Sequence, residues 1–229
     1  EDIMYDFKSI LATKAPKEQR GMKEIQSEDI GLHYSSVTDY LDAVVGYDKD
    51  MMSAIDRLIE RYNLGATNET VGEHRGSVLP RIDKNGRIAG GSVIHFDVSN
   101  GTVLKNSKLT DHLYQWYCYD YYKDDDVFFG EHTLRFMPVA VVREEKTALL
   151  GALADYPLHW LAVGYGRQLT RKMIDKLYGR QVVLFPDESV DQEWELLFGT
   201  DVKVDKSYVK ADINRHLINR INKKGGCNA

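Results

Sequence analysis

The chain has 229 residues, of which 43% are hydrophobic and 28% charged, and its formal net charge is −5 at pH 7. This length and composition are typical of one large globular domain, or two small ones, with a real core. The negative charge excludes a uniformly basic surface, so any nucleic-acid contact must come from a local patch. No apolar run reaches the roughly 18 residues that span a bilayer, and the polar start is neither a signal peptide nor a lipidation motif. We therefore expect a cytoplasmic protein without a membrane partner.

Familiar catalytic and metal-binding motifs are missing from the sequence. The two cysteines, Cys118 and Cys227, cannot form a zinc cluster of closely spaced pairs. The seven histidines show no metal-ligand spacing, and there is no Walker loop, dinucleotide fingerprint or nucleophile elbow. Acidic residues remain as the candidate ligands of a metal ion.

The first part of the chain predicts an arm followed by two helices. Residues 1–34 alternate charged and apolar residues without a sustained period, which is typical of a linker or a loosely attached arm. Apolar residues then recur at helical spacing from Ser36 to Val45 and from Met51 to Tyr62, and the second run stops near Gly65. This spacing predicts a packed helical pair.

An antiparallel meander is expected next. Asn85-Gly86 and Asn100-Gly101 separate short β-prone runs, and Asn-Gly pairs favour hairpins with type I′ turns. The Gly90-Gly91 pair predicts a β-bulge. The β-prone runs are at 77–83, 92–97 and 102–104.

Residues 111–129 are dense in aromatic side chains and include the acidic run from Asp124 to Asp126. Aromatic rings can stack on bases, but such platforms work beside basic groups that hold phosphate. Because this segment is acidic, we expect its aromatic residues to pack in the core or against a partner.

From Pro138 the pattern alternates between strand and helix. Val139–Val142 and Val182–Phe185 are unbroken apolar runs, as expected for strands buried on both faces. The fold class is therefore α/β, a parallel sheet with helices on both faces, preceded by a mixed helical and antiparallel-β part. The predicted strands are 138–142, 159–163 and 181–185, and the predicted helices are 144–155, 170–177, 190–198 and, in a basic tail, 210–222.

Acidic residues follow two of these strands. Glu144 and Glu145 come after the first strand, and Asp187 and Glu188 come after the third. Because parallel strands end at one edge of a sheet, these carboxylates can converge on one divalent cation. The pattern predicts a Mg²⁺ site with Glu144, Glu145 and Asp187 as catalytic candidates. The candidate metal ligands are Glu144, Asp187, Glu188 and Asp191.

The order of several short motifs resembles the catalytic core of bacterial DNA primases, and more closely the primase-like toprim family of bacterial mobile elements. The resemblance covers roughly residues 50–200. It implies a primase-core-like subdomain at 35–135, a toprim-like domain at 136–202 and a basic helix and tail at 203–229. The motifs are Leu79–Gly91, Val103–Ser107, Val127–His132, Arg143–Ala148 and Leu184–Asp187.

The chain departs from the family pattern at the metal site. The family's first toprim strand ends in an essential Glu, which falls on Arg143, and its Asp-x-Asp falls on Asp187-Glu188-Ser189. A guanidinium at the first ligand position would repel Mg²⁺ and tend to pair with Asp187. The alternative is a rescued site in which Glu144 substitutes and Glu188 or Asp191 completes the cage. The amino-terminal zinc ribbon of primases is not found in these 229 residues, so an upstream module outside this chain and a member without one both stay open.

Three functions follow from the resemblance. The favoured one is a degenerate primase-like protein of a mobile element or replication system that binds DNA, RNA or a replication partner with impaired catalysis. The alternatives are an active Mg²⁺-dependent primase or nuclease, and a purely structural or interaction domain. The candidate nucleic-acid contacts are Lys146, Arg167, Arg171, Lys172 and the basic tail.

Overall fold

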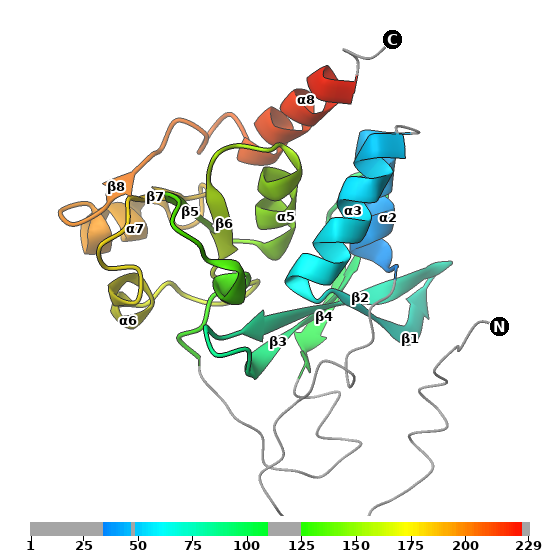
Figure 1. The fold of residues 1–229 in the computed structure, drawn as a ribbon, viewed down its shortest axis with the longest axis horizontal. Helices are drawn as coiled ribbons and strands as arrows, with labels where there is room; N and C mark the ends of the chain where they lie inside the picture. The colour runs from blue at the N-terminus through cyan, green and yellow to red at the C-terminus, as the bar shows by residue number, and fades with distance from the viewer. Residues whose placement is uncertain (1–33, 47–48, 110–124, 226–229) are drawn as a thin grey trace, which may run out of the picture.

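The computed structural model describes residues 34–46, 49–109 and 125–225 (Figure 1). It contains one antiparallel and one parallel four-stranded sheet, in the orders β1-β2-β3-β4 and β6-β5-β7-β8. This architecture confirms the expected α/β class with a mixed first part. The predicted arm, except Tyr34, and most of the aromatic segment lie outside the described residues.

The first part consists of two helices on an antiparallel sheet (Figure 1). Helix α2 is fixed to the sheet by Ser77, whose hydroxyl accepts the Val37 N–H at 2.8 Å and lies 3.0 Å from the Ser36 hydroxyl. Both predicted helices and the meander are confirmed, and the sheet has one strand more than expected, β1. The elements are α2 (Ser36–Val45), α3 (Lys49–Tyr62), β1 (Gly65–Val71), β2 (His74–Ile82), β3 (Ile88–Phe96) and β4 (Val103–Lys108).

The turns of the meander differ from the predicted type I′. In the two predicted turns, only Gly86 and Gly101 among the central residues have positive φ, whereas type I′ needs it at two successive positions. The first turn is instead held by Asp83, whose carboxylate accepts backbone N–H groups two and four residues later. The expected bulge lies opposite Arg81, where the β2–β3 register shifts next to Gly90.

The second part is a parallel sheet whose four short strands are in register. Val139 of β5 lies between His159 of β6 and Val182 of β7. The predicted strands are confirmed, and β8 adds two residues at the edge beside β7. The elements are η2 (Glu131–Thr133), β5 (Val139–Val142), α5 (Glu145–Leu153), β6 (His159–Ala162), α6 (Arg171–Asp175), β7 (Val182–Phe185), α7 (Asp191–Phe198), β8 (Lys203–Val204) and α8 (Ile213–Gly225).

Alternate residues of β5 point into two different cores, as period-two side chains require. Ala140 and Val142 belong to the core under α5, which also contains residues of α2, α3 and α8. Val139 and Val141 belong to the core under α6 and α7. Helices therefore cover both faces of the parallel sheet, as the apolar runs predicted. None of the described helices is long and apolar enough to cross a membrane.

Contacts of α5 and α3 join the two parts of the fold. The ring of Tyr62, at the end of α3, stacks on Phe129 with centroids 5.2 Å apart. The Lys146 ammonium, on α5, donates to the carbonyl of Gly101 at 2.6 Å. Figure 1 shows α5 between the parallel sheet and α3. The carboxyl ends of the parallel strands are thereby held next to the antiparallel sheet.

Candidate functional site

The carboxyl edge of the parallel sheet brings Arg143 and Asp187 together, as expected from their places after β5 and β7. Arg143 Nη1 donates to Asp187 Oδ2 at 2.9 Å and to the hydroxyl of Ser189 at 2.7 Å. The Ser189 hydroxyl and N–H both donate to Asp187 Oδ1, at 2.5 and 2.9 Å. Both oxygens of this carboxylate are therefore already occupied by protein donors.

The ionised form of Asp187 is stabilised by these donors. Burial alone would raise the pKa of Asp187, but the hydrogen bonds from Ser189 and the guanidinium of Arg143 outweigh it, and its pKa is lowered. Burial likewise opposes the charge of Arg143, but Asp187 outweighs it, so the pKa of Arg143 is raised. The two groups form a stable ion pair at neutral pH.

Glu145, a predicted catalytic residue, points away from this pair and is buried against the other sheet. It is 1% exposed, and it accepts the Ser92 hydroxyl at 2.9 Å and the Tyr165 N–H at 3.0 Å. Desolvation is the main cause that raises the pKa of Glu145. In this position the carboxyl connects the two sheets.

The predicted metal ligands do not form a cation site in the structure. The nearest described cation to Glu144 is Lys146, whose Nζ lies 4.0 Å from its carboxylate, and Glu188 is exposed in the loop after β7. Asp191 is the first residue of α7. Within the described residues no group of three or more His, Cys, Asp and Glu is placed to hold a metal ion. Because a guanidinium, that of Arg143, already binds Asp187, the residues present do not fit Mg²⁺.

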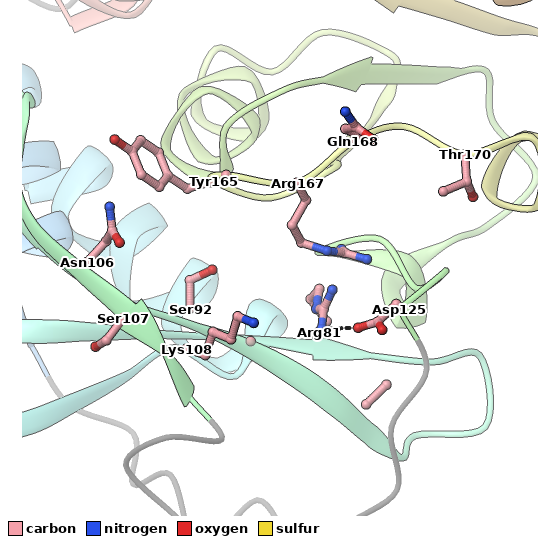
Figure 2. Close-up of a pocket in the computed structure, with 13 residues that line it drawn as sticks. Arg81, Ser92, Asn106, Ser107, Lys108, Asp125, Tyr165, Arg167, Gln168 and Thr170 are labelled. Atoms are coloured by element: carbon pink, nitrogen blue, oxygen red, sulfur yellow. Dashed lines mark ion pairs between the residues drawn. The ribbon is translucent and has the colours of Figure 1, made fainter.

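A larger feature lies beside this edge, a cleft of about 710 Å³ between the antiparallel sheet and the loop after β6. Figure 2 shows Arg167 reaching from that loop toward Arg81 on β2, with Lys108 at the end of β4 beside them. Asp125 is the acidic residue among the lining side chains, and its carboxylate is 4.0 Å from Arg81. Polar side chains of Ser92, Asn106, Ser107 and Gln168 are also part of the lining.

Two of the three basic side chains in the cleft are held in place by the fold. Arg167 Nη1 donates to the carbonyls of Val163 at 2.7 Å and Val127 at 3.1 Å. Burial and the neighbouring charge of Arg81 lower the pKa of Arg167 to about 10, so it stays protonated at neutral pH. Arg81 is 7% exposed, and Gly90, at φ +139°, leaves room for its guanidinium because a Cβ there would overlap it. Two desolvated cations thus face one concave space.

The remaining predicted nucleic-acid contacts are placed elsewhere. Lys146 is 8% exposed and serves the contact between the two parts of the fold. Arg171 forms ion pairs with Asp175 and Asp201 on the outer side of α6. Lys172 is exposed, with its ammonium 3.8 Å from Asp126. Of the four predicted residues, Arg167 alone lines the cleft.

Sequence reasoning missed Arg81 and Lys108 as cleft residues. Both come from antiparallel strands far along the chain from Arg167, so only the packing of the two sheets shows that they converge. One signal was available for Arg81, a charged residue inside the otherwise apolar run Val78–Ile82. A charge in a buried strand is costly unless the protein uses it.

The sequence model of one protein family, described as a domain of unknown function (DUF6371), matches residues 35–188, more than half of the chain. The chain belongs to DUF6371. The matched range contains the Arg143–Asp187 pair and all three basic residues of the cleft. No curated protein matches the chain.

Solved primase domains are similar in structure to this DUF6371 chain. The primase fragment of the bacteriophage T7 primase-helicase protein has a TM-score of 0.50 and 16% identity, over 94% of this chain and 82% of that one. The RNA polymerase domain of Mycobacterium tuberculosis primase DnaG has a TM-score of 0.43 and 12% identity, over 81% of this chain and 82% of that one. The T7 likeness shows a primase-like fold, which confirms the expected fold, and a fold alone does not establish an activity.

Proposed function

We propose that this DUF6371 protein binds nucleic acid by its phosphate backbone in the cleft between the two sheets. The observation that carries the proposal is a pair of guanidiniums, that of buried Arg81 and that of half-buried Arg167, facing one space of about 710 Å³. Guanidinium groups match phosphate oxygens in geometry and charge, and anchored ones lose little entropy on binding. Lys108 adds a third cation at the exposed side of the cleft.

The local charge of the cleft makes this binding compatible with a net charge of −5 for the whole chain. Three basic side chains and one carboxylate, that of Asp125, line the space, so its balance is positive. Polar side chains such as Gln168 can hydrogen-bond sugar and phosphate oxygens without reading sequence. We expect binding that depends on salt and varies little with base sequence.

Catalysis is impaired in this proposal, because Arg143 stands where a toprim primase has its essential Glu. The ion pair with Asp187, at 2.9 Å, supports this assignment. The motif order further supports a degenerate toprim protein of a mobile element or replication system, acting in the cytoplasm with replication proteins as partners. Glu144, Asp187 and Glu188 line one pocket with Arg143, but Asp187 is paired with that arginine and Glu145 is bound to Ser92 instead. Within the described residues no three such side chains are grouped to hold a metal ion.

Binding is tested by fluorescence anisotropy with a labelled oligonucleotide, comparing the wild type with Lys108→Glu. The matched control is Lys105→Glu, which reverses an exposed lysine on the same strand outside the cleft lining. We expect the Lys108 variant to lose at least about tenfold in affinity and to lower the salt slope by about 0.7 to 0.9, the share of one phosphate contact. Equal affinities for the wild type and the Lys108 variant would overturn the proposal.

The impaired catalysis is tested separately by primer synthesis and nicking with Mg²⁺ or Mn²⁺, for the wild type beside Asp187→Ala. We expect no metal-dependent product from either protein. A product that requires metal and disappears in Asp187→Ala would establish the alternative, an active Mg²⁺-dependent enzyme. Binding in the cleft would then be judged from the anisotropy result alone.

A further inference from the structure

The opposite, amino-terminal edge of the parallel sheet carries a second basic cluster, built around His159. Arg61 reaches it from the end of α3, Arg135 from the segment before β5, and Arg180 from the segment before β7. The guanidinium of Arg180 donates to the carbonyl of Arg135, so these two segments touch. Within the described residues none of the three arginines forms an ion pair with a carboxylate. This edge therefore presents uncompensated positive charge.

The hydrogen bonds of His159 leave donors facing one another. His159 is 2% exposed, and its Nε2 accepts the backbone N–H of Arg135 at 3.0 Å, so in the neutral ring Nδ1 carries the proton. Burial and the three arginines lower the pKa of His159, which keeps the ring neutral. Nη2 of Arg61 lies 3.2 Å from Nδ1. Two N–H groups cannot hydrogen-bond each other, so an acceptor oxygen beside both of them would relieve this contact.

Exposed aromatic side chains flank the same cluster. Phe136 follows Arg135 directly, and Tyr178 precedes Arg180 by two residues. Phe136 is fully exposed and Tyr178 is 95% exposed, although large aromatic rings are normally among the more buried side chains. Met137, beside Phe136, is also exposed. Flat apolar rings next to cations that can hold phosphate are the elements of a platform for unpaired bases.

We propose that this edge is a second nucleic-acid surface that takes a single strand, with phosphates on Arg61, Arg135 and Arg180 and bases stacked on Phe136 and Tyr178. The proposal rests on the proposed function for the class of ligand but uses none of the cleft residues. A duplex fits poorly, because its bases are already stacked on one another. A protein partner could also bury these rings, so the abasic comparison below separates it from a single strand.

The test measures the affinity for two strands of equal length, oligothymidylate and its abasic analogue, by anisotropy. Wild type is compared with Phe136→Ala/Tyr178→Ala, and the matched control is Leu104→Ala/Leu196→Ala, which removes two exposed apolar side chains elsewhere. Each stacked base is worth at least about a fivefold change in Kd, so the aromatic variant should lose about 25-fold or more for oligothymidylate. For the abasic strand the same variant should bind as the wild type does.

The outcomes separate this surface from the cleft. Loss of oligothymidylate affinity in the aromatic variant with normal affinity in Lys108→Glu supports this surface and overturns the cleft. Loss of affinity in Lys108→Glu with normal affinity in the aromatic variant supports the cleft and overturns this surface. Equal losses for oligothymidylate and the abasic strand would show that the rings do not stack on bases and would overturn the proposal. Strand binding that stays unchanged in the aromatic variant while a protein contact is lost would also overturn the proposal. Oligouridylate in place of oligothymidylate distinguishes RNA from DNA as the natural strand.

Discussion

Replacing Glu145 tests whether this carboxyl connects the two sheets rather than holding a metal ion. Two variants separate its shape from its charge. Glu145→Gln keeps an oxygen for the Tyr165 N–H and an amide that can donate to the Ser92 hydroxyl. Glu145→Ala removes both hydrogen bonds, leaves Ser92 and Tyr165 without this acceptor, and creates a void at a position that is 1% exposed. The structure predicts very different costs for these two changes.

The magnitudes follow from the groups that lose their partners. In Glu145→Ala, an unpaired Tyr165 N–H costs about 1–3 kcal/mol and the cavity adds to that, so we expect a loss of about 2–4 kcal/mol. Glu145→Gln should stay within about 1 kcal/mol of the wild type at pH 7. Because burial raises the pKa of Glu145 above 4.5 in the folded state, ionisation destabilises the wild type. Relative to Glu145→Gln, the unfolding free energy of the wild type is therefore highest below pH 4.5, and it falls as the pH rises toward the pKa of Glu145 in the folded state.

The assay is urea unfolding of the wild type and both variants between pH 4 and pH 8. The difference in unfolding free energy between wild type and Glu145→Gln should change with pH by at most about 1.4 kcal/mol per unit, the limit for one proton. Glu188→Gln removes an exposed carboxylate from the same edge and should stay within about 0.5 kcal/mol. A Glu145→Ala protein as stable as the wild type, or a difference that does not vary with pH, would show that this carboxyl does not connect the sheets.

Two further predictions concern the packing of α5 and the ion pair at the sheet edge. Gly151→Ala improves helix propensity by about 1 kcal/mol, but a Cβ there would overlap the Trp160 ring, so urea unfolding should show a net loss of about 2 kcal/mol; a more stable variant would contradict this packing. A double-mutant cycle of Arg143→Ala and Asp187→Ala should give a coupling of about 0.5–1.5 kcal/mol, limited by solvent screening because Asp187 is 40% exposed. Because the pKa of Asp187 is lowered, this coupling should persist above pH 3.8 and disappear as the pH falls through the folded pKa, and a coupling of zero at pH 7 would contradict the pair.

The fold was predictable where the sequence pattern was strong. Val139–Val142 and Val182–Phe185 are apolar on both faces, and this is the mark of buried parallel strands. Strand β1 escaped prediction because its outer half, Asn68–Thr70, is polar and exposed at the edge of the sheet. Strand β8 has two residues, too few for any period to show. The turn type was mispredicted because Asp83 holds a longer loop by its own hydrogen bonds.

The candidate site was predictable only where it depends on the ends of parallel strands. Arg143 and Asp187 each follow such a strand, so their contact could be expected from topology. Lys146 looked available for phosphate, but helix α5 turns it into the interface with Gly101. The cleft brings Arg81 and Lys108 to Arg167 through packing between the two sheets, which no local pattern records.

We propose that the cleft binds nucleic acid by charge and that the Arg143–Asp187 pair takes the place of a metal site. Both points are tested together by the affinity of the wild type and Asp187→Ala for one labelled strand, measured with Mg²⁺ and with a chelator. We predict affinities that fall with salt, as phosphate binding requires, and that change neither with the chelator nor with the substitution. Binding that needs Mg²⁺ and is lost in Asp187→Ala would contradict the account.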